Sequence, residues 1–239
     1  MKPVVLITGG ASFLGRAVSR KFAQEGFDLV LHYQTSQGKA RELARELFSL
    51  GAEVWLVKAD LRKVKQVSSL ITGAEKKFKR LDLLVNNASL FYPTPFTSRQ
   101  LAPWLDLFNV NLFSPYFLSQ AAFPLLKKTS GSIVNITDIY GENPILKDYS
   151  AYCVSKSGLI TLTRILAREL GPKVRVNAVS PGAIFIPKSY SQKQRNELLN
   201  RSALKRQGTP EDIAEAVYFL ATQSFITGQV LKVDGGRFA

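Results

Sequence analysis

The sequence is poor in the residue types that build disulfides and histidine-based sites. Its 239 residues include one cysteine, Cys153, and one histidine, His32. A single cysteine excludes an internal disulfide and any cysteine-cluster metal site, and it is typical of a reducing compartment. One histidine argues against a zinc site or a histidine-based catalytic triad. We therefore predict a cytoplasmic protein that binds no metal.

Long hydrophobic runs are also missing. The apolar stretch that begins at Val4 ends at glycines after a few residues, which is too short for a membrane span and has no small-residue cleavage site. We interpret it as a buried strand and predict no membrane partner. Hydrophobic residues make up 46% of the sequence, enough for one sizeable core. We expect a single domain over residues 1–239, with a cofactor half at about 1–130 and a catalytic and substrate half at about 131–239.

Acidic residues are scarce relative to basic ones. The chain has 18 Asp and Glu against 32 Lys and Arg, a formal net charge of +14. Such a charge suits nucleic acid, an anionic membrane surface or a phosphorylated small molecule. The basic residues are scattered over expected helices, without an arginine-rich tail or a nucleic-acid-binding module. We interpret them as a solvated surface and predict no nucleic-acid partner.

Short apolar runs alternate with segments of helical period along the whole chain. The expected strands are Val4–Thr8, Leu29–Tyr33, Glu53–Lys58, Leu81–Asn86, Ser132–Ile136, Arg175–Val179 and Val230–Val233. The expected helices are Leu14–Gln24, Lys39–Leu50, Val64–Lys77, Gln100–Leu126, Ala151–Leu170 and Glu211–Ala221. This alternation predicts the α/β class: a single-domain Rossmann fold with a doubly wound parallel sheet of about seven strands and helices on both faces. Ligands of such sheets bind beyond the carboxyl ends of the strands.

A glycine-rich segment, Thr8–Gly15, joins the first expected strand to the first helix. Glycines let the backbone approach a pyrophosphate, whose charge is favoured by the N–H groups and dipole of the helix start. The spacing differs from the usual dinucleotide fingerprint, so the turn alone fits a purely structural role equally well. Its position at the first strand–helix junction favours a cofactor site.

The second strand ends in the segment His32–Ser36, which holds no carboxylate to meet a free ribose 2′-hydroxyl. Thr35 and Ser36 can instead donate hydrogen bonds to a 2′-phosphate, which favours NADPH over NADH. The alternative is that these residues only start a helix capped by Ser36. Asp60, after the third strand, can accept from an adenine amino group or cap the next helix.

The fourth strand ends in Asn86–Ser89. A small residue at Ala88 lets the chain pass close to a flat cofactor, and the neighbouring asparagine amides can fix the loop or contact ribose. An Asn-Asn pair in isolation is an ordinary turn. The position of this pair at the carboxyl end of a strand favours the cofactor contact.

The candidate catalytic residues are Tyr152, Lys156, Asp138 and Asn111. Tyr152 and Lys156 stand four apart on an expected helix and share a face, where an ammonium would lower the pKa of the phenol; alone, such a pair is an ordinary surface pair. Asp138 ends the fifth strand, where it can bind substrate, orient Tyr152 or cap the next loop. Asn111, expected in mid-helix, can hold a water that relays protons through Lys156, or be a buried amide.

These motifs together resemble the short-chain dehydrogenase/reductase family over essentially the whole chain. The matching pieces are the Thr8–Gly15 turn, Asp60, Asn86–Ala88, Asn111, Tyr152 with Lys156, Pro181-Gly182 and the ending Thr227–Gly236. The resemblance implies hydride transfer with NADPH and a homotetramer. The cofactor-binding residues that we expect are Thr8, Gly9, Ser12, Phe13, Leu14, Gly15, His32, Tyr33, Thr35, Ser36, Asp60, Leu61, Asn87, Ala88, Ser89, Tyr152, Lys156, Pro181, Gly182 and Ile184.

Three features are similar to the pteridine reductases of that family. Asp138 stands where most members carry serine and pteridine reductases carry aspartate; Asn87–Pro95 is similar to their pterin-binding loop; and Leu31–Tyr33 resembles the end of their second strand. The similarity implies a reductase of dihydrobiopterin, dihydromonapterin or dihydrofolate, with the proton supplied by Tyr152 and Asp138. Phe91 would stack on the pterin. The implied substrate-binding residues are Ser89, Phe91, Asp138, Tyr152 and Pro187.

Asp138 also has a physical bearing on the substrate. An ionised carboxylate cannot donate the hydrogen bond that a carbonyl substrate needs, whereas it matches the donors of a flat pterin. Three positions depart from the pattern: Phe13 and Thr35 replace arginines of the pteridine reductases, and Ile186 replaces a threonine that many members use on the nicotinamide carboxamide. A 3-oxoacyl-carrier-protein reductase is the alternative function, and a non-catalytic cofactor-binding protein is the third.

Overall fold

Seven parallel strands form the central sheet of the computed structural model, which describes residues 1–187 and 189–239. The strands are β1 (Val4–Ile7), β2 (Asp28–Tyr33), β3 (Val54–Lys58), β4 (Leu83–Asn86), β5 (Ser132–Ile136), β6 (Arg175–Pro181) and β7 (Val230–Val233). Their order is β3-β2-β1-β4-β5-β6-β7, and each adjacent pair is parallel. The expected doubly wound sheet is therefore confirmed.

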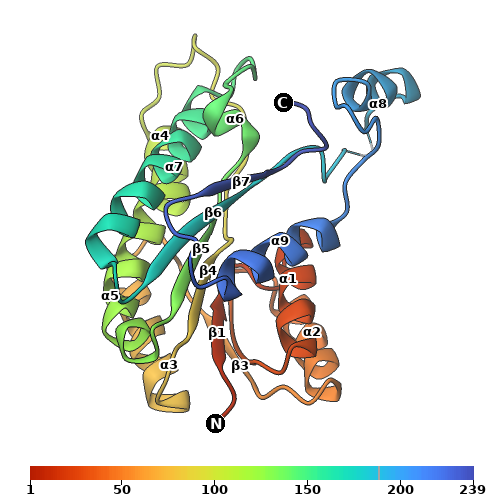
Figure 1. Ribbon diagram of the computed structural model, residues 1–239. Coiled ribbons are helices and arrows are strands. Elements are labelled where there is room, and N and C mark those ends of the chain that lie inside the picture. The colour runs from red at the N-terminus through yellow and green to blue at the C-terminus, as the bar shows by residue number, and fades with distance from the viewer. Residues whose placement is uncertain (188) are drawn as a thin grey trace.

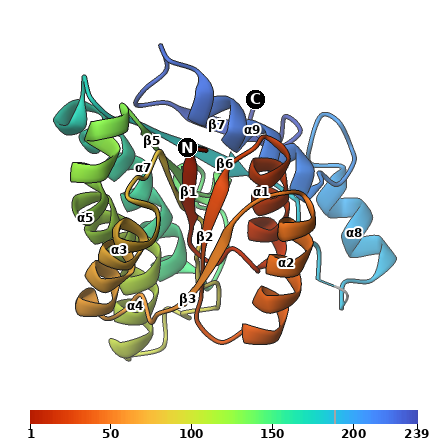
Figure 2. The same ribbon diagram turned by 90° about the horizontal axis from the view of Figure 1, so that it is seen from below.

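Helices cover both faces of this sheet (Figures 1 and 2). One face carries α3 (Val64–Phe78), α5 (Ser114–Thr129) and α7 (Ser150–Leu170), and the other carries α1 (Phe13–Gln24), α2 (Gln37–Ser49) and α9 (Pro210–Thr222). From β1 the chain moves outward to β2 and β3, and then returns to place β4 on the other side of β1. A ligand crevice is expected at this reversal, beyond the carboxyl ends of β1 and β4.

The single helix expected over Gln100–Leu126 is wrong. The segment forms α4 (Ala102–Phe108), a π-helical turn η1 (Asn109–Phe113) and α5. Pro103 and Pro115 lie in the first turns of α4 and α5, where the missing proline N–H leaves no helix bond unmade. Asn111 therefore lies in a π-helical turn rather than in the middle of an α-helix.

Two short helices occupy segments expected to be loops. Asp138 caps α6 (Ile139–Glu142), since its Oδ1 accepts the N–H of Tyr140 at 2.8 Å. The helix α8 (Gln192–Leu199) starts with a capping box between Ser191 and Gln194, a pattern visible in the sequence. No helix within the described ranges is long and apolar enough to cross a membrane.

Candidate active site

The turn after β1 is built around close backbone contacts. A Cβ atom on Gly15 would lie 2.2 Å from the carbonyl oxygen of Gly9, so only glycine fits there. The hydroxyl of Thr8 accepts the N–H groups of Asn87 at 2.9 Å and Ala88 at 3.0 Å. These bonds join the turn after β1 to the loop after β4, as expected for two segments at the reversal of the strand order.

Two side chains hold this turn in place. The Asn87 amide nitrogen lies 2.7 Å from the carbonyl oxygen of Thr8 and 3.1 Å from that of Gly9. Ser12 caps α1, because its hydroxyl accepts the N–H of Gly15 at 3.2 Å. The asparagine amide thus fixes the loop, which was one of its two expected roles.

The two loops border a cleft of about 310 Å³. Most of its lining had been predicted to bind the cofactor; the lining comprises Gly9, Ser12, Phe13, Leu14, His32, Gln34, Leu61, Asn87, Ala88, Ser89, Leu90 and Val110. The sequence analysis did not predict Gln34, Leu90 and Val110 as lining residues, because no sequence motif marks such side chains as part of a binding cleft. The cleft brings together residues from five separate parts of the first 110 positions.

His32 supports the turn through both of its ring nitrogens. Its buried imidazole lies with Nδ1 3.2 Å from the donating N–H of Gly9 and Nε2 3.0 Å from the carbonyl oxygen of Ala59. The Gly9 bond requires an unprotonated Nδ1, so Nε2 carries the proton and donates to Ala59. The imidazole therefore positions the cofactor turn, and its two hydrogen-bonding positions are used by the backbone.

The ends of β2 and β3 hold the other predicted cofactor contacts. Ser36 stands at the N-cap position of α2, but its hydroxyl makes no capping bond. Its expected role as a helix cap is therefore not realised, and Tyr33 and Thr35 precede it at the end of β2. Asp60 binds Arg62, whose Nε donates at 2.8 Å, while α3 begins beyond it with Lys63 as its N-cap residue. The cap alternative for Asp60 is wrong.

Three predicted catalytic side chains meet at the end of β5. The Tyr152 hydroxyl donates to Asp138 Oδ2 at 2.6 Å. The buried Lys156 Nζ donates to the carbonyl of Ile136 at 2.8 Å and lies 5.9 Å from the centroid of the Tyr152 ring. Tyr152 and Lys156 share one face of α7, as their spacing predicted, while Asp138 follows the strand directly.

The electrostatics of this cluster differ from the expectation. Burial raises the pKa of Asp138, although the hydrogen bond from Tyr152 opposes this. Burial, and then the charge of Asp138, raise the pKa of Tyr152 well above its ordinary value. The expected lowering of the Tyr152 pKa by Lys156 is therefore wrong, because the phenol bonds directly to a carboxylate while burial lowers the pKa of Lys156 to about 8. Tyr152 stays protonated at neutral pH and can act as a proton donor.

Asn111 joins the π-helical turn to the loop after β4. Its Oδ1 accepts from the Ser89 hydroxyl at 3.1 Å and the Leu90 N–H at 2.8 Å. Its Nδ2 donates to the Leu90 carbonyl at 3.0 Å and to the Ser155 hydroxyl at 3.1 Å. All four hydrogen-bonding positions of the amide are used. The side chain has no position left for the predicted relay water. It instead links Ser89 to Ser155, the residue that precedes Lys156.

Phe91 lies beside the catalytic tyrosine. Its ring is 57% exposed, stacks on Tyr149 with centroids 4.6 Å apart and meets the edge of Tyr152 at 4.7 Å. The next residue anchors the loop, since the Tyr92 hydroxyl donates to Asp106 at 3.0 Å. A large aromatic ring is thus held exposed next to the proton donor.

The loop after β6 closes the other side of the site. Pro181 ends β6, Gly182 donates its N–H to Val233 at 3.0 Å, and Ile184 is buried. Phe185 meets Phe13 edge to face with centroids 5.6 Å apart. Phe13, which stands where pteridine reductases carry arginine, therefore packs against the loop after β6. Pro187, predicted to bind substrate, belongs to the same loop, and the next residue, Lys188, lies outside the described residues.

Comparison with known proteins identifies the family. A family model described as enoyl-(acyl carrier protein) reductase matches residues 9–237. A solved structure from Burkholderia xenovorans, named a putative short-chain dehydrogenase/reductase, is 30% identical, with a TM-score of 0.90, over 99% of this chain and 98% of that one. The chain belongs to the short-chain dehydrogenase/reductase family. Its members' shared chemistry makes it a nicotinamide-dependent oxidoreductase.

Other members of the family are similar over their full lengths. A 3-oxoacyl-(acyl-carrier-protein) reductase from Staphylococcus epidermidis is 33% identical over 100% of both chains, and one from Synechocystis is 36% identical over 98% of this chain and 96% of its own. A blue fluorescent protein from a metagenomic library, solved with NADPH, is 32% identical with a TM-score of 0.93 over 99% and 98% of the two chains. The two named reductases act on 3-oxoacyl groups, and neither is a pteridine reductase of the kind that Asp138 and the Phe91 loop resemble.

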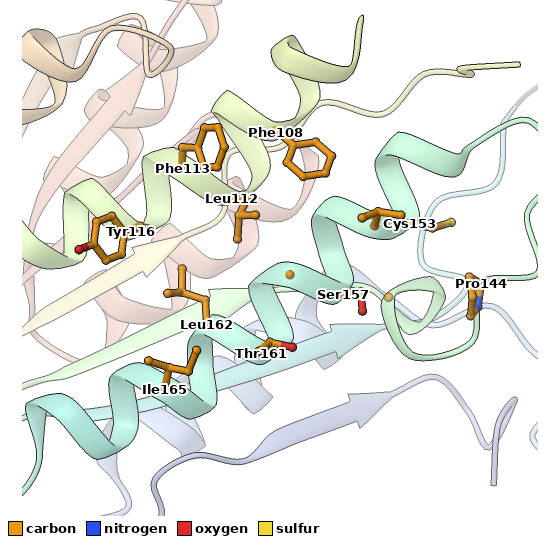
Figure 3. A pocket seen from close by; sticks show the side chains of 13 residues that line it. Phe108, Leu112, Phe113, Tyr116, Pro144, Cys153, Ser157, Thr161, Leu162 and Ile165 are labelled. Carbon is orange, nitrogen blue, oxygen red and sulfur yellow. The ribbon is translucent and has the colours of Figure 1, made fainter. Parts of the chain in front are cut away.

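A larger cavity of about 610 Å³ lies away from the catalytic residues of this family member. It lies along α7, η1 and α5, and Figure 3 shows Leu112 and Leu162 pointing toward each other between these helices. Its walls are mostly apolar, and they include the exposed side chains of Phe113, Val154 and Ile165. Neither Tyr152 nor Asp138 lines it, so it is a separate surface feature.

Proposed function

We propose that this family member is an NADPH-dependent reductase of dihydropteridines. The observation that supports this most strongly is the Asp138–Tyr152 pair, in which a carboxylate lies 2.6 Å from the proton donor. By the resemblance described above, most family members carry serine, with a neutral hydroxyl, in place of Asp138. A carboxylate accepts hydrogen bonds from the ring N–H and amino groups of a pterin, whereas it repels the oxygen of a carbonyl substrate. The exposed ring of Phe91 supplies a flat surface for the same ligand.

NADPH fits the residues that border the cleft. The Gly9–Gly15 contact leaves the backbone open to a pyrophosphate at the start of α1. At the end of β2, the hydroxyls of Thr35 and of Ser36, which makes no capping bond, can donate to a 2′-phosphate. No carboxylate stands in this segment to repel the phosphate. The metagenomic relative solved with NADPH supports this choice. When bound, NADPH supplies the hydride.

The chain's own residues supply the proton. As hydride adds to the carbon of a ring C=N bond, the nitrogen takes a proton from the Tyr152 hydroxyl, so one C–H and one N–H bond form together. The raised pKa of Asp138 lets this carboxylate take up a proton from solvent and return it to Tyr152. Lys156, held on the Ile136 carbonyl, stabilises the transient phenolate.

A second candidate function is the reduction of 3-oxoacyl thioesters. The full-length similarity to 3-oxoacyl-(acyl-carrier-protein) reductases favours it. The net charge of +14 would then attract an acidic carrier protein. In this function Asp138 has to be protonated to donate to the carbonyl, which its raised pKa permits.

Replacement of Asp138 separates the two candidates. We expect the wild-type protein to reduce 7,8-dihydrobiopterin with NADPH, and Asp138→Ser to lower its kcat/KM by about 100-fold or more, because the pterin loses its acceptor and Tyr152 its partner. With acetoacetyl-CoA, the same variant should keep or gain activity. Asp138→Asn, which preserves the shape, should behave like Asp138→Ser on the pterin. Turnover of acetoacetyl-CoA without any turnover of dihydrobiopterin would reject the pterin proposal in favour of the second candidate.

We also propose that the protein forms a homotetramer, as the family resemblance implies. The apolar cavity walls between η1, α5 and α7 offer a face for a second copy, because Phe113 is 42% exposed, Val154 48% and Ile165 47%. Burial of such side chains favours association. Sedimentation equilibrium measures the assembled mass directly, and a monomer at micromolar concentration contradicts the proposal.

A further inference from the structure

The C-terminal segment reaches the catalytic end of the molecule. After β7 the chain runs to a C-terminus on the same side as α6 and α8 (Figure 1). Asp234 clamps the segment, since its Oδ1 accepts the N–H of Gly236 at 2.9 Å and its Oδ2 accepts that of Phe238 at 3.1 Å. The Leu204 N–H donates to the Gly235 carbonyl at 3.0 Å. These bonds fix the backbone on both sides of Arg237.

From this clamp the Arg237 side chain extends to Tyr140, two residues after Asp138. Its guanidinium carbon lies 5.5 Å from the centroid of the Tyr140 ring. The backbone N–H of that same Tyr140 donates to Asp138. Burial raises the pKa of Asp138, and the positive charge of Arg237 is among the influences that oppose this. Arg237, near the C-terminus, is therefore a third charged group of the site, in addition to Asp138 and Lys156.

The polar groups of Arg237 lack partners. Its Nε is buried and has no hydrogen-bond partner, and across residues 1–187 and 189–239 its side chain makes neither a hydrogen bond nor an ion pair. A buried donor without an acceptor costs free energy that a bound ligand would recover. Asp138, whose pKa the charge of Arg237 lowers, is already bonded to Tyr152 and to the Tyr140 backbone.

A second arginine, Arg201, also influences the pKa of this tyrosine. Burial raises the pKa of Tyr140, and the charges of Arg237 and Arg201 both oppose this effect. Arg201 is exposed and forms no salt bridge with the described part of the chain. Within residues 1–187 and 189–239 neither arginine forms a salt bridge, a charge arrangement that suits an oxyanion and disfavours a cation.

We propose that Arg237 is a substrate-binding residue that holds an oxyanion of the substrate, a carboxylate or phosphate away from the atom that is reduced. Arg201 adds to the attraction from the rim. The proposal rests on the proposed reductase function, and it names the substrate class more closely: the preferred substrate carries a negatively charged tail. Guanidinium groups suit this task because they bind both oxygens of such a group at once.

A matched pair of substrates tests the proposal. 7,8-Dihydrofolate carries carboxylates on its tail, whereas 7,8-dihydrobiopterin has the same reducible ring and a neutral tail. We expect Arg237→Met to raise KM for dihydrofolate by about tenfold or more and to leave KM for dihydrobiopterin unchanged. Arg237→Lys should restore part of the loss. The control Arg168→Met, at an exposed arginine near the end of α7, should change neither KM.

The same comparison applies to the second candidate function. Acetoacetyl-CoA carries phosphates, and acetoacetyl-N-acetylcysteamine is its neutral counterpart, so Arg237→Met should weaken only the first. An equal effect on both members of the pair that is turned over, or no effect on either, would overturn the Arg237 proposal.

Equilibrium binding of the oxidised ligands folate and biopterin, and of coenzyme A, needs no turnover. We expect Arg237→Met to raise the Kd of folate, of coenzyme A or of both by about tenfold, and to leave the Kd of biopterin unchanged. Unaltered binding of both anions overturns the proposal. Absence of turnover in every pair, with tight and Arg237-dependent anion binding, would reject the reductase function and retain the anion site.

Discussion

Replacing Tyr152 with phenylalanine will lower kcat/KM by about 100- to 10,000-fold, the range typical of a lost general acid. The hydroxyl donates to Asp138 at 2.6 Å, and the ring that carries it lies next to the exposed side chain of Phe91. Phenylalanine keeps the buried ring and its packing, so the fold remains while the transferable proton is lost. Steady-state oxidation of NADPH with the preferred substrate measures the effect, and a thermal melt verifies the fold.

Tyr149 provides the matched control for this substitution. It precedes α7, stacks on the same Phe91 ring and makes no side-chain hydrogen bond with the described residues. Tyr149→Phe should therefore keep kcat/KM within about twofold of the wild-type value. If Tyr152→Phe retains more than about a tenth of wild-type activity, the proton comes from another group and the assignment of Tyr152 fails.

Replacing Lys156 with methionine will make the protein more stable at neutral pH and nearly inactive. Burial lowers the pKa of Lys156 to about 8 from its ordinary value of 10.5, so holding the charged form in the fold costs about 3 kcal/mol at about 1.36 kcal/mol per pKa unit. Loss of the hydrogen bond to Ile136 offsets about 1 kcal/mol of this gain. We expect a net rise of about 2 kcal/mol in the free energy of unfolding at pH 7, with kcat/KM lowered about 100-fold or more.

The pH dependence gives this prediction a definite sign. Below pH 8 both the folded and unfolded chains bind the Lys156 proton, and the cost is constant. Between about pH 8 and 10.5 the folded chain releases the proton while the unfolded chain keeps it, so this residue makes the wild type more stable as pH rises. Lys156→Met should lack that rise. Urea titrations at several pH values measure it; Lys173→Met, at an exposed lysine, should keep it.

The fold and the members of the site were predictable because they follow from local patterns. Ser132–Ile136 and Val230–Val233 matched the observed β5 and β7, since apolar runs bounded by turns are read directly from sequence. Tyr152 and Lys156 came together because helical spacing puts them on one face. The Asp138–Tyr152 contact followed from the rule that ligand sites lie at the carboxyl ends of parallel strands.

Other features depended on contacts that no local pattern contains. The π-helical turn at Asn111 and the four bonds of its amide arise from three segments packed together. The raised pKa of Tyr152 results from burial and from the direction of one hydrogen bond, neither of which is visible in a Tyr-x-x-x-Lys spacing. Arg237 lies 99 positions from Asp138 in the sequence, and only the return of the chain along β7 places it near the site.

The chain's one histidine gives the nucleotide end of the enzyme a vulnerability to acid that the catalytic end lacks. The His32 bond from Gly9 exists only while the imidazole is neutral, and burial lowers the pKa of His32 below its ordinary value of 6.5. As pH falls below 6.5 the unfolded chain takes up a proton that the folded chain resists, so folding loses free energy progressively. In mildly acidic conditions, the glycine turn therefore loses the support of the imidazole.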